Sequence, residues 1–206
     1  MIMNKKIFIL FNFLLPAIVF AQTPYERLGQ KAMMNGDFSE AATYFEKAYA
    51  ADNSNTNSLY LMGYAFYHAS NYKKSVESFD KLIAFKPAEP IAYYYRGKAK
   101  LLLNAQIKDY KSLEKEPLLL SAIKDFSTGI ELNPSDMKLY QNRGMAYQEY
   151  GIFKSQKVAN IYNKNAATMA VNASIVDLKK VLADNGARKD IATQIEKSKQ
   201  LLSNIK

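Results

Sequence analysis

The sequence predicts an all-α protein, built as a solenoid of about four helix pairs with a C-terminal capping helix. Three glycines, Gly29, Gly63 and Gly97, recur every 34 residues, and the same interval separates Phe45 from Phe79. Around these markers, apolar residues repeat at the spacing of a helix. A repeat of this length is typical of stacked helix pairs, because one pair cannot bury its apolar face alone.

The first 21 residues predict a cleavable signal peptide. A lysine pair is followed by an apolar run from Ile7 to Phe20 and by the small residue Ala21. This run is about 14 residues long, whereas a membrane-spanning helix needs roughly 20. We therefore expect residues 22–206 to form one repeat domain that is periplasmic or secreted. An uncleaved N-terminal anchor is the alternative.

Two regular units come first, at about 22–55 and 56–89. In the first unit, the small residues Gly29 and Ala41 let the two helices approach closely, while large residues between them fill the groove. Pro87 prevents continuation of the second unit's last helix.

The third unit, at about 90–136, is longer. Phe79 and Phe126 occupy matching positions but are 47 residues apart, so this unit carries 13 extra residues. They fall at about 105–117, in a charged and polar stretch. Its last residue, Pro117, suits the first turn of the next helix.

The fourth unit, at about 137–186, is longer still. Phe126 to Leu178 spans 52 residues, which implies an 18-residue insertion within about 154–172. Apolar residues continue through this insertion, which predicts lengthened helices rather than a loop. Residues 187–205 then read as the capping helix that a solenoid requires.

The pattern resembles tetratricopeptide repeats over nearly all of residues 22–206, with the fourth unit divergent. The first unit reads Tyr25-x-x-Leu28-Gly29-x-x-Ala32 and then Ala41-x-x-x-Phe45-x-x-Ala48; the last two units open Tyr93-x-x-Arg96-Gly97 and Tyr140-x-x-Arg143-Gly144. The resemblance implies a right-handed solenoid in which the first helix of each unit lines a concave groove.

The resemblance also implies which side chains face that groove. The partner-binding positions carried over from it are Gln30, Met33, Tyr60, Tyr64, Tyr67, His68, Tyr94, Lys98 and Met145. The three tyrosines of the second unit recur at four and three residues, so they lie along one helix face. Tyrosine suits recognition, because its ring offers contact area and its hydroxyl orients the partner. The alternative is that these rings pack between adjacent units.

One subtype of this family binds a C-terminal carboxylate through a lysine and an asparagine in its first unit. This chain has Glu26 and Gln30 at those two positions. A glutamate would repel a carboxylate, so we expect an apolar or aromatic protein segment instead, bound as a helix or an extended strand.

The composition argues against catalysis. The chain has no cysteine and a single histidine, His68, which excludes the usual thiol and zinc sites. It also lacks the glycine-rich motifs that cradle phosphates or present a nucleophilic serine. We expect a protein that is not an enzyme, with no cofactor, no metal and no catalytic residue.

The positive charge is concentrated near the C-terminus. Residues 137–206 hold 12 basic and 5 acidic side chains, whereas residues 22–136 hold 14 of each. Such asymmetry is typical either of a scattered basic surface or of weak contact with anionic lipid or glycan. Nucleic acid is not expected as a partner of an exported protein.

Together these observations predict a non-catalytic scaffold or adaptor that holds a protein segment in a tyrosine-lined groove. A periplasmic holding chaperone for exported proteins is one alternative, favoured by methionines at groove positions. An envelope module that contacts glycan or lipid through the basic C-terminal third is another.

Overall fold

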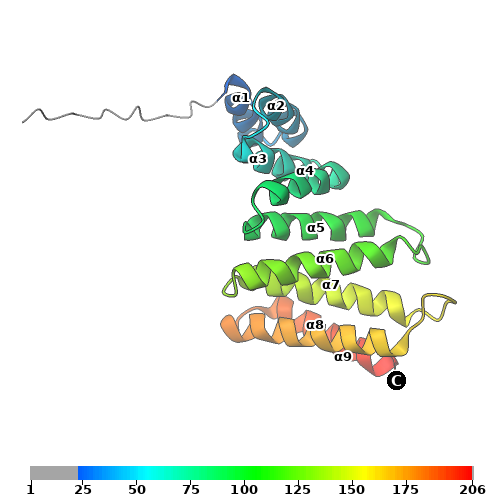
Figure 1. The fold of residues 1–206 in the computed structure, drawn as a ribbon. Coiled ribbons are helices and arrows are strands. Elements are labelled where there is room, and N and C mark those ends of the chain that lie inside the picture. Colours follow the sequence, from blue (N-terminus) through cyan, green and yellow to red (C-terminus); the bar gives the residue numbers. More distant parts are fainter. Residues whose placement is uncertain (1–22, 206) are drawn as a thin grey trace, which may run out of the picture.

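The computed structural model describes residues 23–205, and this part of the chain folds into nine α-helices without a strand (Figure 1). The predicted signal peptide lies outside the described residues. The helices are α1 (Pro24–Met34), α2 (Phe38–Ala51), α3 (Thr56–His68), α4 (Tyr72–Phe85), α5 (Pro90–Gln106), α6 (Lys115–Leu132), α7 (Met137–Ser155), α8 (Lys164–Asp184) and α9 (Lys189–Ile205).

The helices stack in chain order, so that neighbours in the sequence are neighbours in space (Figure 1). Four pairs follow one another, and α9 packs on the last of them. This arrangement confirms the predicted all-α repeat fold. None of the helices in residues 23–205 combines the length and the hydropathy that crossing a bilayer requires.

The recurring glycines mark where the two helices of a pair come closest. A Cβ atom added to Gly29 would lie 2.8 Å from the ring of Phe45, and one added to Gly63 would lie 2.9 Å from the ring of Phe79. Both phenylalanines are fully buried. The glycine is therefore needed for close approach, because a larger residue would overlap the ring of the paired helix.

The same contact is kept across the insertion in the third pair. A Cβ atom on Gly97 would lie 2.8 Å from the ring of Phe126, although this pair is longer than the first two. The insertion is therefore accommodated away from this contact, in the ends of the helices and in the loop between them.

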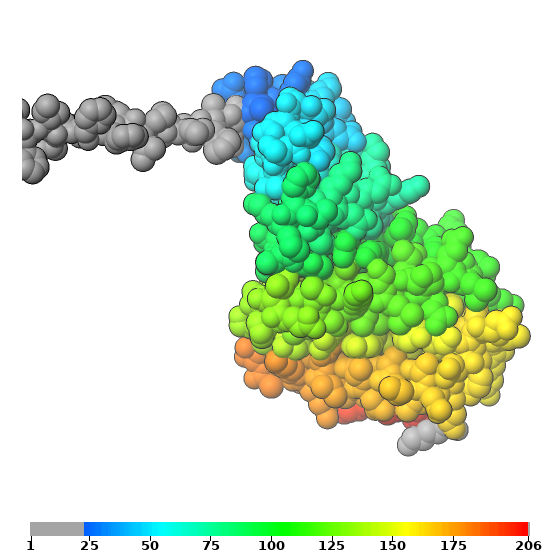
Figure 2. Space-filling model, in the orientation of Figure 1, coloured from blue at the N-terminus to red at the C-terminus, as the bar shows by residue number. Residues whose placement is uncertain are grey.

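Both insertions lengthen helices. The four helices from α5 to α8 have 17 to 21 residues, whereas the four before them have 11 to 14. Pro117 lies in the first turn of α6, as predicted. Loops at 107–114 and 156–163 remain, and both lie at the same side of the stack (Figure 1). As a result the C-terminal half is broader than the N-terminal half (Figure 2).

The lengthened ends share a hydrophobic core of their own. Leu119 from α6, Phe153 from α7 and Ile161 from the second loop are each at least 98% buried and pack together. The second loop is therefore held against the helices by its own apolar side chain.

Candidate functional site

Five tyrosines on two neighbouring helices form one cluster of rings, which we call the tyrosine cluster. Its members are Tyr60, Tyr64 and Tyr67 on α3 and Tyr94 and Tyr95 on α5. Tyr95 is the centre: its ring centroid lies 5.3 Å from that of Tyr64, 5.6 Å from that of Tyr67 and 5.1 Å from that of Tyr94. All five side chains are partly exposed.

The sequence interpretation missed Tyr95. Its ring stacks on buried Phe79 of α4 at 5.7 Å with an interplanar angle of 11°, so it joins the core to the surface. Burial, followed by the neighbouring tyrosines, raises its pKa far above the usual value, which keeps the phenol neutral. The run Tyr93-Tyr94-Tyr95 was visible in the sequence, but only Tyr94 fell on a position that the repeat pattern assigns to the groove.

His68 lies at the edge of this cluster, at the end of α3. Its ring stacks on Phe38 with centroids 4.7 Å apart and lies 4.4 Å from the ring of Tyr64. Although His68 is exposed, partial desolvation and then the nearby charge of Lys98 lower its pKa. The imidazole is therefore neutral near pH 7 and behaves as one more aromatic ring.

Lys98 places a positive charge over the tyrosine cluster. Its Nζ atom lies 4.9 Å from the ring centroid of Tyr67 and 5.2 Å from that of Tyr94. Both distances are those of a cation–π contact, which holds the ammonium group beside the rings while leaving it partly exposed.

A groove begins at this lysine and runs along the C-terminal half of the solenoid. It has a volume of about 630 Å³ and lies between α5, α7 and α9. Tyr67, Lys98 and Met145, three of the residues assigned to the groove, contribute to its lining, together with Leu101, Leu102 and Ile152. The tyrosine cluster and this groove are continuous through Tyr67 and Lys98.

The remaining assigned residues lie elsewhere. Gln30 and Met33 are partly buried on α1, where Met33 packs on the core of the first pairs. Tyr60 also lines a smaller hollow of about 230 Å³ between α3, α4 and the start of α5. In residues 23–205, no three histidine, aspartate or glutamate side chains come together as a metal site would require.

Glu26 does not face an open groove, contrary to the expectation that it would repel a carboxylate there. It is 3% exposed and accepts hydrogen bonds from Thr23 N and Ser58 Oγ, both at 2.8 Å, and from Asn55 Nδ2 at 3.1 Å. Burial alone would raise the pKa of Glu26, but these hydrogen bonds outweigh it and leave the pKa below its usual value. Its role is to cap α1 and to tie it to α3.

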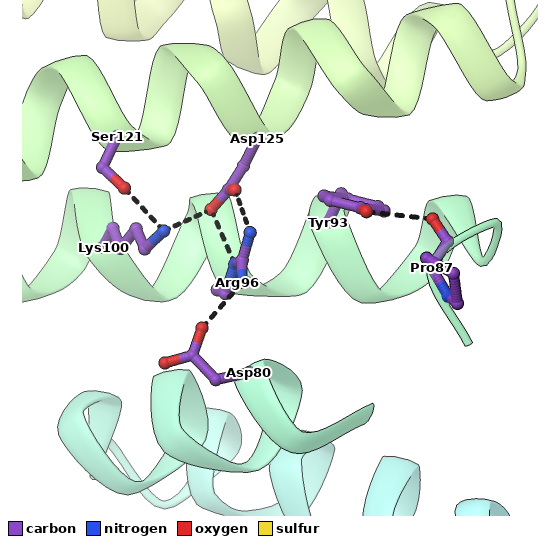
Figure 3. A network of polar contacts seen from close by, with 7 residues as sticks. All are labelled: Asp80, Pro87, Tyr93, Arg96, Lys100, Ser121 and Asp125. Atoms are coloured by element: carbon purple, nitrogen blue, oxygen red, sulfur yellow. Dashed lines mark hydrogen bonds and ion pairs between the residues drawn. The ribbon is translucent and has the colours of Figure 1, made fainter. Parts of the chain in front are cut away.

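A buried ionic network joins α4, α5 and α6 (Figure 3). Asp125 of α6 accepts from Arg96 Nε at 3.1 Å and from Lys100 Nζ at 2.7 Å. Arg96 also reaches Asp80 of α4 at 2.7 Å, and Lys100 donates to Ser121 at 2.7 Å. The network fixes α5, which carries two of the five clustered tyrosines, against both neighbouring helices.

The next pair repeats this arrangement. Arg143 of α7 donates two hydrogen bonds of 2.8 Å to the carboxylate of Asp177 on α8 and one of 3.2 Å to Ser127 on α6. Sequence analysis did not identify either ion pair. The signal was present, however, because an arginine precedes the glycine in both units and an aspartate precedes the matching large residue, Phe126 or Leu178.

Comparisons with known proteins agree with this architecture. A family model described as tetratricopeptide repeat matches residues 27–90. No curated protein matches the chain.

Solved structures of similar shape are also repeat proteins. TTC0263, a thermophilic tetratricopeptide-repeat protein of Thermus thermophilus, is 18% identical with a TM-score of 0.53, over 86% of this chain and 98% of that one. A crystal structure of MamA protein is 20% identical with a TM-score of 0.56, over 86% and 89%.

The second tetratricopeptide-repeat domain of human RPAP3, in complex with an HSP70 peptide, is 18% identical with a TM-score of 0.51, over 59% of this chain and 91% of that one. Identities this low speak for the fold alone. The family match therefore assigns tetratricopeptide repeats to residues 27–90, and the solved structures show that the chain as a whole shares their repeat fold.

Proposed function

We propose that the protein is a non-catalytic scaffold or adaptor that holds a segment of another protein against its odd-numbered helices. The observation that carries this proposal is the partly exposed tyrosine cluster, which opens through Lys98 into a groove of about 630 Å³.

The cluster has the properties of a recognition surface. Its rings already pack on one another and on Phe79, so a partner would find them ordered and little conformational entropy would be lost on binding. Each phenol keeps a hydroxyl that orients a ligand, and tyrosine is enriched among the residues that dominate binding energies. The adjacent ammonium group of Lys98 adds a charge that is held in place by two rings.

Similar solved structures support the ligand class. The first tetratricopeptide-repeat domain of RPAP3 is described as bound to an HSP90 peptide, and the second as complexed with an HSP70 peptide. From these proteins we carry over to this chain only the ability of a repeat fold of this kind to bind a peptide.

The proposed location is the cell envelope. The N-terminal lysine pair, apolar run and small residue at 21 support export, followed by release of residues 22–206 into the periplasm or the medium. The basic C-terminal residues would then add a weak contact with an anionic envelope surface. N-terminal sequencing of the protein purified from cell fractions tests this location, with Gln22 expected as the first residue.

A holding chaperone for exported proteins is the second candidate. Met34 is 88% exposed and Met145 is 38% exposed, and flexible methionine side chains tolerate varied ligands. This function predicts capture of many unrelated chains rather than one.

Crosslinking in intact cells, followed by mass spectrometry of the captured proteins, separates the two candidates. The adaptor function predicts one dominant partner. Tyr64→Ala should weaken its binding by about 1 kcal/mol or more, because Tyr64 is a partly exposed ring of the cluster beside Tyr95. Tyr162→Ala is the matched control, since Tyr162 is exposed on the loop at 156–163.

Both variants should keep the helix content of the original protein, measured by far-UV circular dichroism. A broad set of captured proteins would favour the chaperone. Equal binding by the Tyr64 and Tyr162 variants would show that the tyrosine cluster is not part of the binding site.

A further inference from the structure

The groove between α5, α7 and α9 has an apolar floor. Leu101 and Leu102 of α5 and Met145 and Ile152 of α7 line it. Met145 and Ile152 are 38% and 40% exposed, although both are apolar. The volume of about 630 Å³ lies within the range of sites that enclose a ligand, about 300–1,000 Å³.

The charges around this floor are mostly positive. Three lysines line the groove, Lys98 from α5, Lys115 from the start of α6 and Lys197 from α9, against one carboxylate, Glu149 of α7. Lys98 is held by the tyrosine rings, and Lys115 Nζ donates to the backbone oxygen of Asn104 at 2.9 Å. Two of the three cations are therefore fixed at the rim of an apolar surface, which an acidic ligand would complement.

A buried amide points to the kind of group that completes the site. Asn104 lines the groove and is 5% exposed, yet its Oδ1 atom has no hydrogen-bond partner in residues 23–205. A buried polar atom without a partner is uncommon, because losing its hydrogen bond to water destabilises the folded state. A peptide group carries both a donor and an acceptor. An extended peptide backbone can therefore form a hydrogen bond with the side-chain amide of Asn104 whichever way that amide is turned.

We propose that this groove binds an extended protein segment in which an acidic side chain stands beside an apolar one. The carboxylate lies between Lys98 and Lys197, the apolar side chain lies on Leu102, Met145 and Ile152, and a backbone amide bonds to Asn104. This inference rests on the proposed scaffold function and adds the chemistry of the partner.

The ligand differs from a C-terminal carboxylate, since it requires only side-chain acids. A suitable probe is therefore a short fluorescent peptide that alternates leucine with aspartate and ends in an amide. The control probe has asparagine in place of every aspartate. Fluorescence anisotropy with the full chain should show tighter binding of the acidic probe, and that preference should decline as salt increases.

Three variants locate the site. Lys197→Ala should weaken the acidic probe about two- to fivefold, the range of one exposed ion pair. Asn104→Leu should weaken the binding of both probes, because the side-chain amide of Asn104 contacts the peptide backbone that both probes share. Lys199→Ala should leave binding unchanged: Lys199 lies on the same helix but pairs with Glu196 and lines a hollow between α8 and α9.

Glu149→Gln should have the opposite effect and strengthen the binding of the acidic probe, because it removes the one negative charge in the lining of the groove. Partial desolvation in this groove raises the pKa of Glu149, although the residue as a whole remains exposed. A gain of affinity is not produced by unfolding, so this variant tests the proposal even where Asn104→Leu destabilises the protein.

A selection from a random peptide library separates this inference from the proposed function. Enrichment of acidic and apolar peptides that lose affinity in Lys197→Ala supports both. Enriched peptides without acids, or acidic peptides indifferent to Lys197, overturn the ligand chemistry but leave the scaffold function standing. Failure to select any peptide overturns both, as does binding of a second copy of the chain in this groove, which light scattering would detect as a dimer.

Discussion

Removing the carboxylate of Asp125 tests how the solenoid holds α5 in place. Asp125 is 3% exposed and accepts from both Arg96 and Lys100, so Asp125→Ala leaves the buried ammonium of Lys100 facing the partly buried guanidinium of Arg96 (Figure 3). In the intact network two carboxylates, those of Asp80 and Asp125, balance these two cations. The variant has an uncompensated positive charge.

The expected loss is about 3–5 kcal/mol in the free energy of unfolding, which is typical when one member of a buried ion pair is removed. Arg96 retains Asp80, but that carboxylate is 54% exposed and compensates less than a buried one. Lys100 retains only the hydroxyl of Ser121. Most of the destabilisation should therefore come from Lys100.

This division can be measured with a second substitution. Lys100→Met keeps the aliphatic packing but removes the charge that Asp125→Ala leaves unpaired. The double variant should therefore be more stable than Asp125→Ala alone. Urea denaturation followed by far-UV circular dichroism measures all three, with Glu131→Ala, an exposed carboxylate on the same helix, as the control.

A loss of less than about 1 kcal/mol in Asp125→Ala would refute the reasoning, because it would equal the effect of an exposed ion pair. A double variant that is less stable than both single variants would refute the assignment of the loss to Lys100.

Three further predictions concern packing and protonation. Gly97→Ala should lower the free energy of unfolding by about 1–3 kcal/mol, because its Cβ would lie 2.8 Å from the Phe126 ring; thermal unfolding measures the loss, and an unchanged melting temperature would contradict it. Glu26→Gln should cost about 1–2 kcal/mol near neutral pH. Since the folded pKa of Glu26 is lowered, its contribution is complete above pH 4.5 and is lost as the pH falls through the lowered value, so urea denaturation should show the gap between the variants narrowing in acid. The pKa of His68 should lie below 6.5 in an NMR titration, so stability falls as the pH drops below that value; a pKa above 6.5 would show that the Phe38 and Tyr64 rings do not desolvate it.

The sequence was sufficient to predict that the helices of a pair approach closely at Gly29, whereas the ring that this glycine meets was identified by the structure. Gly29 leaves room for the ring of Phe45 because glycine has no side chain. The same two residue types recur 34 residues later as Gly63 and Phe79, and they make the same contact. The contact between Gly97 and Phe126 followed for the same reason, even though the pair is longer.

Side-chain partnerships across elements were harder to predict. Glu26 was assigned to the groove by its place in the repeat, but Asn55 and Ser58 at the start of α3 enclose it, and only the structure brings them together. Tyr95 was overlooked because its ring lies between the core and the surface, where a pattern of buried and exposed positions has no distinct signal. Arg96 and Asp125 recur in step with the repeat, but their pairing depends on where two helices cross.

The contact between Gly97 and Phe126 is the same as in the shorter pairs, although the helices that carry it extend further on one side. The spacing between paired helices and the width of the solenoid are therefore set by different residues. The glycine and the ring determine how closely the two helices of a pair approach, while the loops at 107–114 and 156–163 determine how far each pair extends. Leu119, Phe153 and Ile161 then fill the added margin. The solenoid can therefore be wider at that margin without any change in the contact between paired helices.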